Sequence, residues 1–173
     1  MVIRIKCVYF DKPALFRLSI LQYDNVKIRA SIVVKTYEWL LCLPAILIGW
    51  DIERFLESTK SLLEEKQPEA RLISFDEEIE VSFIRLSRLR PDIMIIGKLN
   101  QPSAFVDEYP FVNENNCISS VRKVNMDFEG KLQGIKSNFG GLMTDTTEIR
   151  KFLNELHRFM IQSKISTKNP WKT

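Results

Sequence analysis

The fold is decided by residues 49–66, which read Gly49-Trp50-Asp51-Ile52-Glu53-Arg54-Phe55-Leu56-Glu57-Ser58-Thr59-Lys60-Ser61-Leu62-Leu63-Glu64-Glu65-Lys66. Six side chains share the i, i+3, i+4, i+7 spacing of a helix that lies on a core, namely Ile52, Phe55, Leu56, Thr59, Leu62 and Leu63. Asp51 suits the cap of the first turn, and Glu53 and Glu57 suit the positive end of the helix. We therefore predict an amphipathic helix over residues 50–66.

Strand patterns flank this helix on both sides, over residues 1–48 and 70–130. Apolar residues alternate with polar ones, and the sets expected to face inward are Ile3, Ile5 and Cys7; Phe16, Leu18, Ile20 and Gln22; Ile28, Ala30, Ile32 and Val34; and Ile79, Val81 and Phe83, with Arg85 as a further candidate. Because these segments follow one another closely, they favour an antiparallel meander. Pro44 removes a backbone donor, so its strand is expected at an edge or at a bulge.

A second amphipathic helix is predicted over residues 146–162. Asp145 precedes it and Glu148 follows three residues later, which is the capping-box pattern. Its apolar stripe consists of Ile149, Phe152, Leu153, Leu156 and Met160. Gly130, Gly134, Gly140 and Gly141 indicate turns, so residues 131–145 are interpreted as an insertion. The tail, 163–173, is basic and polar, a composition typical of a disordered segment.

These elements predict a single α+β domain over residues 1–173, with both helices packed on one face of a mostly antiparallel sheet. Residues 100–116 form the longest polar, proline-containing stretch, and we expect a loop there. At 173 residues with 45% hydrophobic composition, the chain is long enough to bury a core without disulfides.

The composition also indicates a cytoplasmic protein. No apolar run approaches the roughly 20 residues that a membrane helix needs, so no membrane partner is expected. The N-terminus alternates like a strand and lacks the apolar core of a signal peptide. The three cysteines Cys7, Cys42 and Cys117 are far apart in sequence, which is typical of reduced thiols.

Charge is unevenly distributed along the chain. The net charge is +3, yet residues 51–80 hold ten acidic and four basic side chains. Such a block is a candidate docking surface for a basic partner, although solvation of a helix end and a loop is the simpler explanation. The candidate partner-binding residues are Glu64, Glu65, Glu69, Asp76, Glu77, Glu78 and Glu80. An acidic partner would instead favour the basic turn at residues 85–90.

The sequence contains no recognisable catalytic or metal-binding motif. His157 has no second histidine and no cysteine beside it, so it is interpreted as a surface residue, and we expect no metal and no cofactor. No nucleophile elbow and no phosphate-binding loop is present, so we do not expect an enzyme. Two basic clusters could contact nucleic acid, but the small net charge and the acidic block disfavour it; they are Arg85, Arg88 and Arg90, and Lys164, Lys168, Trp171 and Lys172.

The order of elements resembles a known family. The segments that carry this resemblance are Ile28 to Val34, Trp39 to Ile48, Asp51 to Phe55 with Leu62-Leu63, Ala70 to Phe75, Ile79 to Phe83, Ile93 to Leu99, Val124 to Glu129, and the helix around Phe152-Leu153. Together they resemble the WapI-like immunity proteins of bacterial contact-dependent and polymorphic toxin systems. The resemblance covers roughly residues 15–160 and rests on element order and apolar pattern. The stretches 100–116 and 131–145 depart from the compact form of the family.

The resemblance implies a cytosolic protein that has no reaction of its own and neutralises a cognate toxin C-terminal domain by binding it. It implies no shared site residue, because each member's surface matches its own toxin. A small-ligand-binding module or a nucleic-acid-binding module of the same α+β class remains the alternative.

Overall fold

The computed structural model describes residues 1–37, 40–75, 77, 79–86, 92–99, 109–112, 118–121 and 137–168. In chain order the elements are β1 (Val2–Tyr9), β2 (Lys12–Tyr23), β3 (Lys27–Lys35), β4 (Leu40–Ile48), α1 (Gly49–Leu63), β5 (Glu69–Ile73), β6 (Ile79–Arg85), β7 (Asp92–Leu99), β8 (Tyr109–Val112), β9 (Ile118–Val121), β10 (Ser137–Asp145) and α3 (Thr146–Gln162).

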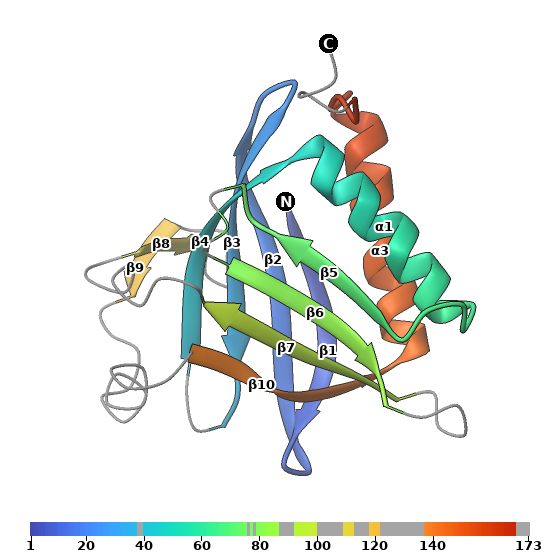
Figure 1. Cartoon of the computed structure of the whole chain (residues 1–173). Coiled ribbons are helices and arrows are strands. Elements are labelled where there is room, and N and C mark those ends of the chain that lie inside the picture. The colour runs from blue at the N-terminus through green and yellow to red at the C-terminus, as the bar shows by residue number, and fades with distance from the viewer. Residues whose placement is uncertain are drawn as a thin grey trace.

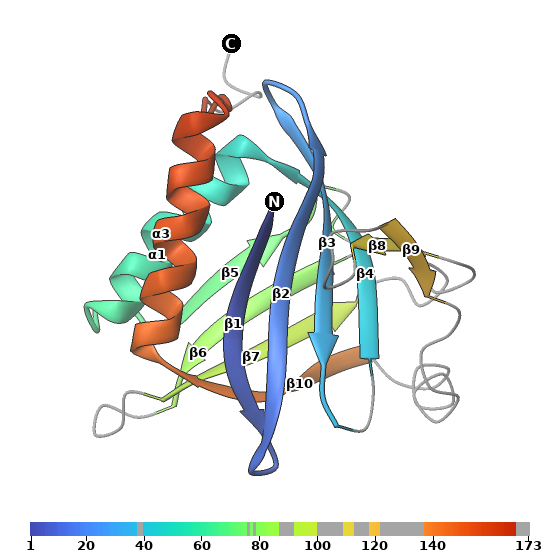
Figure 2. The same ribbon diagram turned by 180° about the vertical axis from the view of Figure 1, so that it is seen from behind.

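Eight strands form one antiparallel sheet in the order β4-β3-β2-β1-β10-β7-β6-β5. The hairpin of β8 and β9 is separate, and β8 lies against β2 and β4. Helices α1 and α3 run side by side on one face of the sheet (Figures 1 and 2). The predicted α+β class, with both helices on one face, is confirmed.

The sheet curls around the helices. Phe16 of β2 and Phe83 of β6 have three strands between them, yet their ring centroids are only 6.2 Å apart. The two edges of the sheet also meet, because the Phe75 amide, just after β5, donates to the Ile46 carbonyl of β4 at 2.7 Å. The inner face is therefore a concave trough filled by α1 and α3.

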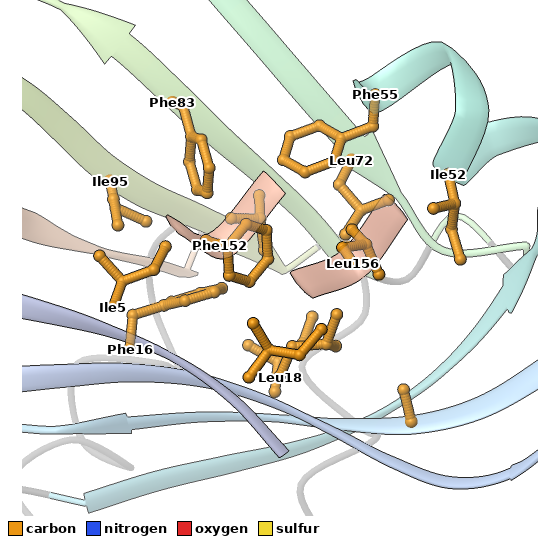
Figure 3. Close-up of a cluster of buried hydrophobic side chains, with 14 of the residues drawn as sticks. Ile5, Phe16, Leu18, Ile52, Phe55, Leu72, Phe83, Ile95, Phe152 and Leu156 are labelled. Atoms are coloured by element: carbon orange, nitrogen blue, oxygen red, sulfur yellow. The ribbon is translucent and has the colours of Figure 1, made fainter. Parts of the chain in front are cut away.

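The core lies between this trough and the two helices (Figure 3). Four phenylalanine rings meet there edge to face, from β2, α1, β6 and α3: Phe16, Phe55, Phe83 and Phe152. The inward-facing strand residues predicted from the alternation are buried, with two exceptions: Arg85 is only partly buried, and Gln22 is exposed because the register of β2 shifts between Ile20 and Gln22. The prediction of the apolar face of α1 is also confirmed in full, because all six of its side chains are buried.

The start of α1 differs from the prediction. Ile48 occupies the N-cap without a side-chain hydrogen bond, and Asp51 lies inside the first turn instead of capping it. The helix ends at Leu63, where the Lys66 amide donates to the Ser61 carbonyl at 2.9 Å and residues 64–66 turn toward β5. The predicted end at residue 66 is therefore three residues too late, because the amide of Lys66 bonds back to the last turn of the helix instead of continuing it.

The predicted cap of α3 is confirmed. The Asp145 carboxylate accepts a hydrogen bond from the Glu148 amide at 2.9 Å. The Glu148 carboxylate, however, bonds to β1, where it accepts from the Lys6 amide at 3.1 Å. The cap therefore also ties the helix to the sheet.

The expectation of an insertion over 131–145 is wrong for residues 137–145. These residues form β10, which lies in the middle of the sheet between β1 and β7. Gly140 and Gly141 sit at a bulge in this strand, where the register shifts and Gly141 has φ +82°. The glycine pair predicted a turn, but here it bends a strand.

The remaining predictions are confirmed in part. Pro44 lies on β4, an edge strand, as expected. The loop expected over residues 100–116 is wrong for Tyr109–Val112, which form β8. The strand β9 lies within the strand region expected over 70–130, and Val124, Met126 and Phe128 lie outside the described residues. The expectation of disorder in the tail is wrong for residues 163–168, because Ile165 is buried and the Ser166 amide donates to the Asn25 carbonyl at 2.7 Å.

Candidate partner-binding surface

The predicted acidic residues follow the course of β5. Five of the seven are described: Glu64 and Glu65 precede the strand, Glu69 begins it, Glu77 lies in the turn after it, and Glu80 of β6 pairs with its last residue. Asp76 and Glu78 lie outside the described residues. The fold thus places these five acidic residues along one edge of the sheet, beside β5.

Much of this acidic charge is paired within the chain. Arg71 contacts Glu69 at 2.7 Å and Glu80 at 3.5 Å, and its guanidinium holds the pKa of Glu69 below the ordinary value. Lys66 contacts Glu64 at 2.7 Å and lowers its pKa in the same way. These ion pairs fix the carboxylates in position and reduce the excess negative charge of the block.

Arg85 belongs to this cluster and not to an exposed basic turn. Its side chain is only 10% exposed and contacts Glu65 at 2.7 Å. It also donates to the Leu63 carbonyl at 3.4 Å, where it complements the negative end of α1. Residues 87–90, the rest of the predicted basic turn, lie outside the described residues.

The outer face of the sheet, opposite the helices, carries a continuous apolar row. Direct cross-strand neighbours supply it: Ile84 pairs with Met94, Met94 with Met143, and Met143 with Val8. Val8 is 43% exposed and the other three are half-buried. We call these four residues the outer row.

Charged side chains border the outer row. Glu69 extends it on β5, where it pairs with Ile84. On one side Asp92 and Asp145 lie directly opposite each other, and on the other Glu80 pairs with Lys98. The face therefore combines an apolar centre with a charged rim.

A shallow pocket of about 380 Å³ opens beside the outer row, where β1 and β10 diverge. On the edge of β1 that faces β10, side chains take the place of backbone partners for Lys6. Thr144 Oγ1 donates to the Lys6 carbonyl at 2.8 Å, and the Glu148 carboxylate accepts from the Lys6 amide. The lining includes Val8 and Met143 together with Asp92, Asp145 and Glu148. The pocket thus shares its walls with the outer row and its acidic rim.

Cys7 also lines this pocket, but its thiol is not activated as a nucleophile. Burial raises the pKa of its thiol to about 12, so the side chain stays protonated at neutral pH. His157 is exposed on α3, as predicted. Among the described residues, no group of three or more potential metal ligands is found.

The β1–β2 hairpin ends in an exposed aromatic tip that the sequence analysis did not identify. Phe10 and Asp11 form the turn, both with positive φ (46° and 60°), and the Phe10 side chain is 73% exposed. Tyr9 packs edge to face on Phe10, and Lys12 Nζ lies 3.8 Å from the centroid of the Tyr37 ring. The sequence signal is a phenylalanine directly before the aspartate of a turn; on their own, Asp11, Lys12 and Pro13 indicate only a break in the strand pattern.

We compared the chain with family models, curated proteins and solved structures, and none of them matches it. None of the described helices has the length and apolar character needed to cross a membrane.

Proposed function

We propose that this protein is a cytoplasmic immunity protein that binds and neutralises a cognate bacterial toxin domain, without a reaction of its own. The docking face is the outer face of β5, β6, β7, β10 and β1. The observation that carries the proposal is the outer row, a line of apolar side chains on a sheet face whose opposite side holds both helices.

The composition of this face supports a protein partner. Protein interfaces combine an apolar centre with a polar rim, and their centres are enriched in methionine and aromatic residues. Two of the four side chains of the outer row are methionines, whose flexible thioethers adapt to a partner's surface. The row also lies on paired strands of a rigid sheet, so little ordering is required when a partner binds.

The charge of this face supports a basic partner at its β5 end. Glu69, Glu77 and Glu80 are held there, two of them by Arg71, and Asp92 and Asp145 flank the middle of the row. Fixed charges of this kind accelerate encounter with an oppositely charged protein and exclude wrong partners. A basic toxin domain, such as a nuclease, would complement this end.

The test is a titration of the full chain against the C-terminal toxin domain encoded immediately upstream of its gene. Met94→Glu places a charge in the centre of the outer row, and we expect it to weaken binding by about 30-fold, the effect of losing one interface anchor. Ile161→Glu is the matched control, because Ile161 is 63% exposed on α3, far from the outer face. Wild-type affinity of the Met94 variant would exclude this docking face.

The acidic rim is tested separately by salt. The double variant Glu69→Gln/Glu80→Gln is expected to slow association and to flatten its dependence on ionic strength, because rim charges act mainly on the encounter rate. The measurement is the association rate at two salt concentrations. If the salt dependence stays that of the wild type, the acidic residues along β5 do not contact the partner.

A further inference from the structure

We infer that Phe10 is the anchor of this docking face, and that its ring enters an apolar pocket with an acidic rim on the partner protein. The inference rests on the proposed function. It adds the residue that anchors the partner and the chemistry of the partner's pocket, which the proposed function does not specify. It is drawn from the backbone of the turn, the support of the ring, and the charges around it.

The backbone of the turn is the first argument. A two-residue turn with positive φ at both positions favours Asn-Gly, because bulky side chains are strained there. This chain places Phe10 and Asp11 at those positions, with φ 46° and 60°. Because the Phe10 ring is largely exposed, burial in the core does not compensate for the strain. Strain of this kind persists where a site requires the residue.

The ring is also held in place. Its centroid lies 4.6 Å from that of Tyr9, whose ring lies 6.3 Å from that of Tyr37. Tyr9 in turn lies over Gly141, where an added Cβ would be only 3.7 Å from the tyrosine ring. A rigid, supported aromatic side chain loses little conformational freedom on binding, which is a property of interface anchors.

The tip projects and is continuous with the docking face. Figures 1 and 2 show the β1–β2 hairpin extending beyond β10, at the opposite end of the molecule from the C-terminal end of α3. Val8, the last residue of the outer row, pairs with Pro13 at the base of this hairpin. A convex projection fits a hollow in the partner, so one partner could cover the row and receive the tip.

The charges around the tip define the rim of that hollow. Lys12 flanks the turn, and Lys6 and Lys35 both pair with Leu15, three paired positions below the Tyr9–Lys12 pair. Asp11 is the acidic residue of the turn, and Lys6 shares its pocket with Asp92, Asp145 and Glu148. On the side of β2 and β3 the hairpin therefore carries Lys12 and Lys35, whereas the β5 end of the same face is acidic. A matching partner carries acidic side chains around its apolar pocket and basic ones about the length of the outer row away.

The experiment uses two variants of the same turn. Phe10→Asn removes the ring and suits positive φ, so the urea midpoint is expected to stay or rise while affinity for the upstream toxin domain falls about 30-fold. Asp11→Gly removes the backbone strain at residue 11 and keeps the Phe10 ring. We therefore expect the free energy of unfolding to rise and the affinity for the toxin domain to stay that of the wild type. Calorimetric titration and urea unfolding measure both quantities.

The outcomes separate this inference from the proposed function. If the wild type binds and Phe10→Asn binds equally well, Phe10 is not an anchor, while the docking face stands. If the wild type does not bind the toxin domain, both ideas fail together. Sedimentation with vesicles of phosphatidylcholine and phosphatidylglycerol is expected to show no binding. Vesicle binding that depends on Phe10, with unchanged toxin affinity, would assign the tip to a membrane and overturn the inference.

Discussion

Gly49 and Gly141 show how single residues set the limits of this fold. Gly49 begins α1, and an added Cβ would overlap the Ser166 carbonyl and lie 2.7 Å from Ile165 Cγ2. At Gly141 an added Cβ would make an ordinary contact with the Tyr9 ring, 3.7 Å from Cε2, but the φ of +82° is unfavourable for any residue with a side chain. One glycine is required by a close approach and the other by the backbone.

Gly49→Ala is expected to destabilise the protein by about 2 kcal/mol, although alanine is the better helix former. The backbone at residue 166 must move, which breaks its hydrogen bond to Asn25 and exposes Ile165. Urea unfolding measures the change. Gly141→Ala is the comparison, with an expected loss of about 1 kcal/mol from φ alone. An unchanged midpoint for Gly49→Ala would mean that residues 163–168 do not pack on α1.

At the scale of elements, the N-terminus of α3 connects the helix to the sheet through Glu148. Its carboxylate accepts hydrogen bonds from Lys151 Nζ at 2.7 Å and from the Lys6 amide, and these two donors lower its pKa below the ordinary value of 4.5. Because the folded-state pKa is lowered, this contribution to stability is present above about pH 4.5 and is lost as pH falls through the folded-state pKa.

Glu148→Gln is therefore expected to destabilise the protein at pH 7 by about 1 kcal/mol and to have a smaller effect at pH 3. The measurement is the free energy of unfolding of both proteins across this pH range. Glu155→Gln on the same helix is the control, because Glu155 is exposed and makes no hydrogen bond or ion pair with another residue of the described part of the chain. A constant gap between wild type and Glu148→Gln would refute the assignment.

The comparison of sequence and structure is also clearest at this scale. Both helices and most strands follow from local periodicity, because each buries one face. β10 could not be predicted, because Gly140 and Gly141 interrupt its alternation and only the pairing with β7 and β1 makes it a strand. The outer row is equally hidden in the sequence, because its four residues come from four strands and meet only through register.

At the scale of the whole molecule, one aromatic cluster joins both halves of the sheet. Phe83 of β6 lies 5.2 Å from Phe55 and 5.9 Å from Phe152, measured between ring centroids, and it also faces Phe16 of β2 (Figure 3). Strands from both ends of the sheet order and both helices therefore share one buried contact set. We expect the domain to unfold in a single cooperative transition.

Phe83→Ala is expected to lower the free energy of unfolding by about 3–5 kcal/mol, because it leaves a cavity where these elements meet. Circular dichroism and intrinsic fluorescence, followed through the same urea titration, should report one shifted midpoint. Ile161→Ala, at an exposed site on α3, is expected to change stability by less than about 0.5 kcal/mol. Separate midpoints for the two probes would show that the two halves of the sheet unfold independently.

The position of β10 has a consequence for synthesis. It is the last strand in the chain, yet it fills the gap between β1 and β7. A nascent chain on the ribosome therefore completes both hairpin systems while β1 and β7 each keep one row of unpaired backbone groups, and such edges recruit other chains. Translation that stops before residue 137 leaves both edges open to aggregation. A chain that reaches α3 covers β7 with β10, and it covers part of β1 with the Val8–Met143 pair and with the hydrogen bonds of Thr144 and Glu148 to Lys6.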